Sequence, residues 1–272
     1  MSAPAETTAA GAGAGSGPAL LSARLLLRSR LAVSGLAIIL VLAALASLAP
    51  VLASEHPDAH GIWKIDLRDT LAAPSSEHPF GTDQLGRDQW SRMLYGARVS
   101  LLIGVAAVSL AIAIGALLGA LAGFLGGAVD NLIMRLMDIM LAFPSILLAL
   151  AIVVAIGHGL FNVMIAVGTV SIPTYARIVR ASVLSESQRD YVEASRALGA
   201  DKARLLFRHV LPNSLSPLIV AASLGIGTAI LDAAGLGFLG LGAEPPRAEW
   251  GLMLADNRQK LFAQWWLVAV PG

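Results

Sequence analysis

The stretch VSLLIGVAAVSLAIAIGALLGALAGFLGGAV, residues 99–129, contains 31 residues and no charged side chain. An α-helix needs about 20 apolar residues to cross the hydrocarbon core of a bilayer. Two further uncharged runs, residues 31–54 and 139–176, have 24 and 38 residues. These three runs predict an all-α, polytopic membrane protein.

The composition also favours a membrane protein. Of the 272 residues, 56% are hydrophobic and 14% are charged, whereas a soluble domain has about 25% charged residues. The absence of cysteine from the sequence excludes disulfides, thiolate nucleophiles and cysteine-ligated metals. The net charge of +1 gives no indication of a nucleic-acid partner, so we expect membrane lipid and no nucleic acid.

The N-terminal region divides into a polar tail and an apolar run. Residues 1–18 are mostly Ala, Gly, Ser, Thr and Pro, which cannot form a packed core, so we expect residues 1–30 to be a disordered cytoplasmic tail. The apolar run 31–53 is longer than the roughly 7–15 apolar residues of a signal peptide. We interpret it as the first transmembrane helix, with a cleaved signal peptide as the alternative.

The later spans follow from run lengths and glycine positions. We expect residues 54–99 to be extracytoplasmic and residues 100–272 to form the core domain. The second helix should end at Gly126-Gly127. The 38-residue run is too long for one span, and Gly157-His158-Gly159 divides it into helices three and four. Helix five runs from about Ser216 to Gly242.

The chain ends on LFAQWWLVAVPG, residues 261–272, which is too short to cross a bilayer. Trp265 and Trp266 are nevertheless typical anchors at a membrane interface. The expected fold is therefore a helical bundle of five complete transmembrane helices plus the start of a sixth. We expect the native gene product to continue far enough to complete that sixth helix.

The distribution of charge predicts the orientation. With the N-terminus in the cytoplasm, the inside segments are 1–30, 126–135 and 177–215, which hold 11 basic and 6 acidic residues. The outside segments hold 8 basic and 10 acidic residues. Because basic residues are enriched on the cytoplasmic side, this arrangement is the expected one.

The segment 177–215 contains two short helices on either side of Gly199. One apolar stripe is formed by Tyr191, Ala194, Ala197 and Leu198, and a second by Leu205, Leu206, Val210 and Leu211. Gly199 suits a helix end with positive φ, Asp201 suits the N-cap of the next helix, and Pro212 should end that helix. Such an element fits a protein partner, and the alternative is a surface loop at the membrane interface.

Several motifs in this chain resemble those of ABC importer permeases. Glu193-Ala194-Ser195, followed by Gly199 and by His209-Val210-Leu211-Pro212, resembles their EAA loop, from which Ser195 and His209 depart. The pair Arg208-His209 before Leu-Pro is similar to the dipeptide and oligopeptide branch. So are HPFGTDQLGRDQWSRMLYGARVSL (78–101), GFLGLGAEPPRAEWGLML (237–254) and WWLVAVPG (265–272). The match covers residues 78–272 and is similar to the C-type permease subunit.

The resemblance implies a permease of the type I ABC importer kind in a bacterial inner membrane. It implies a second homologous permease, two ATP-binding cassette ATPase subunits and an extracytoplasmic binding protein as partners. ATP and Mg²⁺ are expected on the ATPases, because this chain lacks G-x-x-x-x-G-K-[ST], and no catalytic, cofactor or metal site is expected here. The ATPase-coupling residues are expected to be Tyr191, Glu193, Ala194, Ser195, Ala197, Gly199, Arg208, His209, Leu211 and Pro212.

The expected cargo is a di- or oligopeptide, and nickel, glutathione or another small solute stays an alternative within the same branch. A secondary transporter is a further alternative, although it would have no use for the EAA loop. An intramembrane metalloprotease would need H-E-x-x-H, which this sequence lacks.

Small and ionisable residues inside the spans have their own interpretation. Gly115, Gly119 and Gly123 recur every four residues, which favours close helix packing over gating. Carboxylates are costly in a bilayer, so we expect Asp232 and Asp138 to lie at the translocation path or a subunit interface. The simpler account of Asp138 is an i, i+3 pair with Arg135.

Two prolines fall inside the expected spans. Pro144 lies in the third expected helix and Pro173 in the fourth, and proline removes a backbone hydrogen bond and crowds the preceding turn. We therefore expect a kink at each.

Overall fold

A computed structural model of the chain describes residues 30–58 and 61–272, and these residues form helices and no β-strand. The expected tail, residues 1–30, lies outside the described residues except for Arg30. The elements in chain order are α2 (Arg30–Ser47), α3 (Ala49–Leu52), α4 (Gln89–Leu125), α5 (Gly127–Leu141), α6 (Ser145–Ile156), α7 (Leu160–Glu186), α8 (Asp190–Ala197), α9 (Lys202–Arg204), η1 (Leu205–Val210), α10 (Leu211–Asn213), α11 (Ser216–Phe238), α12 (Trp250–Asn257), η2 (Arg258–Lys260) and α13 (Trp266–Ala269).

The chain forms two compact units, Met1–Ala44 and Leu45–Gly272. The described part of the first unit belongs to α2, in which Ala37–Ser47 is a short apolar helix. The expected single helix over 31–53 is wrong in its last six residues, because α2 ends at Ser47 and α3 starts separately at Ala49. Pro50 lies in the first turn of α3, where its missing N–H costs nothing but prevents α2 from continuing.

Among the described residues, α4, α7 and α11 are long and apolar enough to cross a membrane. The pair α5 and α6 also passes as one span, but it is bent by 93°. The bend lies at Pro144, where a kink is expected. Gly157 and Gly159 separate α6 from α7 as predicted, whereas Pro173 lies inside a continuous α7.

Two expected boundaries are wrong for the same reason. The second helix begins at Gln89 instead of about residue 99, because Asp88 caps it by accepting a hydrogen bond from the Ser91 backbone N–H. The segment 126–135, expected as a loop, lies largely within α5. Counting uncharged residues locates the membrane core but not the helix, since a helix continues past its apolar part.

The helices α4 and α7 run parallel and approach each other through the glycine repeat. A Cβ on Gly115 or Gly123 would lie 2.9 Å or 2.8 Å from the carbonyl oxygens of Ile172 and Arg180, and a Cβ on Gly119 would overlap the carbonyl of Ala176. Each of the three glycines therefore faces a backbone carbonyl of α7, and successive carbonyls are four residues apart, as the glycines are. The close approach expected from the repeat is present.

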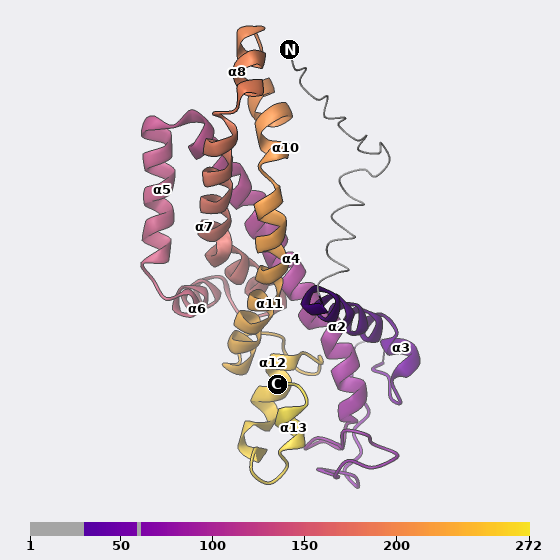
Figure 1. Cartoon of the computed structure of the whole chain (residues 1–272). Helices are drawn as coiled ribbons and strands as arrows, with labels where there is room; N and C mark the ends of the chain where they lie inside the picture. The colour runs from indigo at the N-terminus through magenta and orange to yellow at the C-terminus, as the bar shows by residue number, and fades with distance from the viewer. Residues whose placement is uncertain (1–29, 59–60) are drawn as a thin grey trace, which may run out of the picture. The chain divides into compact units, whose positions relative to one another are not determined.

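The antiparallel helix α11 packs on the same pair. A Cβ on Gly104 would lie 2.6 Å from the Ile230 side chain, and one on Gly225 would overlap the Tyr175 hydroxyl. Figure 1 shows α8 and α10 at one end of the second unit and α12 and α13 at the other. We call these the α8 end and the α12 end. The four-residue α13 lies where the start of a sixth helix is expected.

Replacing Gly119 with alanine should destabilise the protein, because the new methyl group would push α7 away from α4. Overpacking of this kind costs about 1–3 kcal/mol, so the thermal unfolding midpoint of the detergent-purified protein should fall. Gly227→Ala in α11 is the matched control, since a Cβ there meets no atom within 4 Å. Equal midpoints for the two variants would contradict the packing role of Gly119.

Candidate functional site

The coupling element, residues 190–213, forms the α8 end. The helix α8 ends before Gly199, whose φ of 86° is the left-handed conformation expected there. Asp201 caps the next helix as predicted, accepting a hydrogen bond from the Arg204 N–H at 2.7 Å. Helix α9 continues into the π-helical turn η1 and then α10, so the helical run ends at Asn213 and not at Pro212. Pro212 lies one residue before the end of this run, so the predicted helix end agrees with the structure to within one residue.

The two apolar stripes have opposite environments. Leu205, Leu206 and Val210 of the second stripe are buried in the main core of this chain, instead of facing a partner or the membrane interface as predicted. In α8 the fully buried residue is Val192, whereas Leu198 is 89% exposed and Ala194 and Ala197 are also exposed. The face predicted as apolar is therefore turned outward, and α8 holds to the rest of the protein by Val192.

Tyr191 joins α8 to three other elements. Its hydroxyl donates toward Glu186 Oε2 of α7 at 3.0 Å and lies 3.3 Å from the His209 carbonyl of η1. Asn213 of α10 donates through Nδ2 to the same hydroxyl at 3.2 Å and to the His209 carbonyl at 2.7 Å. We call these four residues the Tyr191 joint.

The protonated hydroxyl is essential to this joint, since it donates to a carboxylate. Burial of the hydroxyl, and then its hydrogen bond to Glu186, raise the pKa of Tyr191 above its ordinary value of about 10. The hydroxyl therefore stays protonated at physiological pH. Glu193 is exposed and has no ion pair among the described residues.

The remaining coupling residues lie around the joint. Ser195 donates its hydroxyl to the Tyr191 carbonyl at 2.8 Å within α8. Arg208 and Pro212 are exposed, and Leu211 is half-buried against the core. His209 contributes its backbone carbonyl to the joint, so the departure from an apolar residue at this position leaves that contact unaffected.

Two ion pairs connect α5 to α7. Asp138 accepts from Arg177 Nη2 at 2.5 Å, and Asp130 accepts from Arg180, with Nη2 at 2.6 Å from Oδ2. The expected pairing of Asp138 with Arg135 is wrong, because α7 presents an arginine to the same carboxylate. Asp232 is half-buried in the later part of α11.

The α12 end contains a buried charge network that sequence reasoning did not assign. Asp83 accepts from Arg87 Nε at 2.7 Å and also from Arg92. Arg87 lies 3.9 Å from Asp256 of α12, so the network holds the segment before α4 against α12. All of these residues except Asp256 lie within the 78–101 motif, and the i, i+4 spacing of Asp83 and Arg87 was the available signal.

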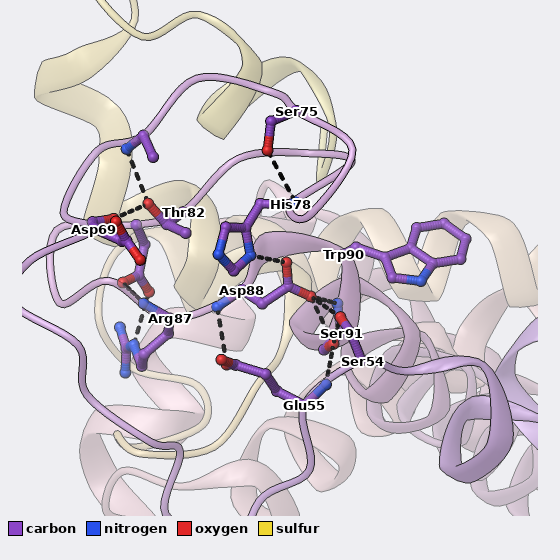
Figure 2. Close-up of polar contacts among 12 residues, drawn as sticks. Ser54, Glu55, Asp69, Ser75, His78, Thr82, Arg87, Asp88, Trp90 and Ser91 are labelled. Atoms are coloured by element: carbon purple, nitrogen blue, oxygen red, sulfur yellow. Dashed lines mark hydrogen bonds and ion pairs between the residues drawn. The ribbon is translucent and has the colours of Figure 1, made fainter.

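A second group of contacts fixes the start of α4, as Figure 2 shows. The Asp88 carboxylate accepts from the Ser54 hydroxyl at 2.9 Å and from the Ser91 N–H at 2.8 Å, and it lies 3.0 Å from His78 Nδ1. Glu55 Oε2 accepts from the Asp88 N–H at 3.3 Å. The segment after α3 is therefore held against the first turn of α4.

A buried carboxylate also fixes the start of α12. Glu249 caps this helix by accepting hydrogen bonds from the Gly251 and Leu252 N–H groups, each at 2.8 Å. Burial raises the pKa of Glu249, while these backbone hydrogen bonds act in the opposite direction. Burial likewise raises the pKa of Asp256, opposed by the charges of Arg92 and Arg87.

These features define a class of protein: an integral membrane permease with a projecting helical element at one end of its bundle. The family described as binding-protein-dependent transport system inner membrane component matches residues 115–271, and the N-terminal TM domain of oligopeptide transport permease C matches residues 20–74. The chain belongs to the first of these families, whose members are transporter subunits that work in multi-component complexes.

Named relatives cover most of the chain. The dipeptide transport system permease of Alkalihalophilus pseudofirmus is 47% identical over 90% of this chain and 79% of its own length. The di/tripeptide permease of Pseudomonas aeruginosa is 50% identical over 89% and 80%, and the probable D,D-dipeptide permease of Escherichia coli is 48% identical over 90% and 80%. They are permease subunits and not enzymes.

One solved structure shares the fold. An inward-facing form of the MetNI methionine ABC transporter superposes with a TM-score of 0.56 at 20% identity, covering 67% of this chain and 87% of the other. At that identity the likeness establishes the arrangement of helices alone.

Removing the Tyr191 hydroxyl should loosen α8. Tyr191→Phe keeps the ring but loses the hydrogen bonds of the joint, each worth about 0.5–1.5 kcal/mol. Amide hydrogen exchange in residues 188–198 should therefore accelerate about three- to tenfold. Ser195→Ala removes only a bond within α8 and is the control. Unchanged exchange in Tyr191→Phe would show that Val192 alone holds α8.

Proposed function

We propose that this chain is one permease subunit of an ATP-driven importer of di- and oligopeptides. Its partners are a second homologous permease, two ATP-binding cassette ATPases and an extracytoplasmic binding protein that delivers the peptide. The observation that carries the proposal is the coupling element, whose outer face is exposed and whose inner face is fixed by the Tyr191 joint. The printed names of the relatives supply the peptide class.

The joint explains how one docked helix moves several spans. An ATPase that holds the exposed face of α8 pulls on Tyr191, which is bonded to Glu186 at the end of α7 and to Asn213 just before α11. Both spans then move with α8, because Val192 and η1 are packed in the same core as α7. ATP and Mg²⁺ are assigned to the ATPases, since this sequence has no phosphate-binding loop.

The alternatives account for fewer of these features. A secondary transporter shares the helices but needs neither the exposed α8 face nor its joint. Nickel, glutathione and other small solutes fit the same permease, and uptake assays with each cargo separate them from peptides. All the named relatives cited above carry peptide transport in their names.

The proposal places the N-terminus and the α8 end in the cytoplasm of a bacterial cell, and the α12 end outside its inner membrane. Because the sequence has no cysteine, single introduced thiols report this directly. Ser76→Cys should react with an impermeant thiol reagent added to intact cells, and Gln188→Cys should react only after lysis. Both positions are exposed. The reverse pattern would contradict the orientation.

A bulky residue at Gly199 should uncouple transport. A β-branched side chain at φ 86° is strained by about 1–2 kcal/mol, so Gly199→Val should reorient α8 relative to α9. Membrane insertion and pairing with the second permease should persist, while co-purification of the ATPases weakens and peptide uptake is lost. Glu193→Lys should act in the same direction but more mildly.

Gly199→Asn is the matched control, because asparagine tolerates the left-handed conformation better than valine does. A Cβ at this position meets no atom within 4 Å, so side-chain size alone causes no clash. Uptake should follow the order glycine, asparagine, valine. Normal uptake with valine would contradict the coupling role of the turn.

A further inference from the structure

The helix α5 carries a polar stripe on its exposed face. The stripe consists of Asn131, Arg135 and Asp138, spaced four and three residues apart, and all three side chains are exposed. Together with Leu132 and Met134 they line an open groove of about 530 Å³. Residues at this spacing lie on one face of a helix, so the groove runs along α5.

The proposed orientation places the stripe deep in the membrane. At about 1.5 Å per residue, Asp138 lies roughly 16 Å along α5 from Gly127 at the α8 end. Arg177 lies roughly 14 Å from the end of α7 at Glu186. A hydrocarbon core is about 30 Å thick, so with these helix ends at the cytoplasmic surface the Asp138–Arg177 pair lies about halfway across it.

At that depth, exposure of these charges to lipid is costly. The side chains of Asp138 and Arg177 are 58% and 50% exposed, whereas those of Asp130 and Arg180 are 15% and 34% exposed. Charged groups at mid-depth normally face a water-filled path or a protein partner. Both pairs join α5 to α7, and the exposed pair also belongs to such a path or partner.

The break between α5 and α6 lies directly beyond the stripe. Asp138 is three residues before Leu141, the last residue of α5, and the chain then bends by 93°. Interrupted helices inside a membrane occur where the backbone borders a cavity or other protein. The stripe and the break thus mark the same region of the bundle.

The charges of the stripe are incompletely matched. Arg177 pairs with Asp138, and Arg135 has no carboxylate within ion-pair distance among the described residues. Arg135 and Asp138 are neighbours one turn apart, about 5–6 Å between their Cβ atoms. A dipeptide carries its two terminal charges on a chain of about 7 Å. One free arginine beside one shared carboxylate is complementary to such a zwitterion.

We propose that the α5 stripe is a binding site for the termini of the transported peptide, with Arg135 taking the α-carboxylate and Asp138 the α-ammonium group. This rests on the proposed peptide import. In the empty site Arg177 neutralises Asp138, and the peptide ammonium group shares that carboxylate when it arrives. The recognised feature is the pair of terminal charges, so the site serves peptides of different side chains.

The test uses the complete transporter reconstituted in liposomes with a loaded binding protein. ATP hydrolysis stimulated by the binding protein reports delivery and coupling, and accumulated dipeptide reports translocation. Arg135→Gln and Asp138→Asn should each lower dipeptide uptake per ATP hydrolysed about tenfold, the loss of one charge-assisted hydrogen bond. Stimulated ATP hydrolysis should stay within about twofold of wild type.

A double variant distinguishes peptide binding by Asp138 from a purely structural role of the Asp138–Arg177 ion pair. If Asp138 and Arg177 only brace α5 against α7, the double variant Asp138→Asn/Arg177→Gln should recover the uptake lost in Asp138→Asn, because no unpaired charge remains. If Asp138 binds the peptide, uptake stays low. Asp130→Asn/Arg180→Gln is the matched control and should lower thermal stability without changing uptake per ATP.

A thiol placed in the groove gives an independent measurement if the charge variants fail to assemble. Asn131→Cys introduces the one cysteine of this chain. A dipeptide delivered by the binding protein should slow its modification by a small methanethiosulfonate reagent. If the thiol reacts slowly without peptide and peptide does not change that rate, the second permease covers the stripe. This result would overturn the proposal. Wild-type complex that fails to import any peptide would instead contradict the proposed function.

Discussion

The contact between the backbones of α4 and α7 is the constraint on which the other helices depend. Inside a bilayer no hydrophobic force draws helices together, so association comes from close packing and polar contacts. The glycine repeat of α4 brings successive carbonyl groups of α7 to the helix surface. Arg180 then serves twice, because its carbonyl faces Gly123 and its guanidinium holds Asp130 of α5. The position of α5 therefore follows from the α4–α7 contact.

The same contact also makes α7 rigid along its length. A helix that packs along α4 over several turns cannot bend locally without separating the glycines from the opposing carbonyls. A displacement of Glu186 at its end is therefore transmitted along its length to Arg177, whose guanidinium holds Asp138. The helix α7 therefore connects the Tyr191 joint with the α5 stripe, and the proposed docking at the α8 end would act on the proposed peptide site through it.

Local sequence signals predicted local features well. The glycine breaks, the cap at Asp201, the left-handed Gly199 and the close approach of the glycine repeat all follow from rules that involve a few neighbouring residues. The errors arose where a distant segment decides the outcome. Asp138 pairs with Arg177, 39 residues away, and Val192 is buried because η1 packs there. No i, i+3 or i, i+4 rule contains such information.

The two ends of the bundle use charge in opposite ways. At the α12 end Asp83, Arg92 and Asp88 are buried and hydrogen-bonded within the chain, so changing their partners would leave a buried charge uncompensated. Toward the α8 end, Glu193, Arg135 and Asp138 are exposed instead of buried. Buried ion pairs and hydrogen bonds hold the segments of the α12 end in place, and the proposed contacts with subunits and cargo involve the exposed charges. A permease that changes conformation during transport needs both the buried and the exposed charges, because helices can move at one end of the bundle only if the other end stays fixed.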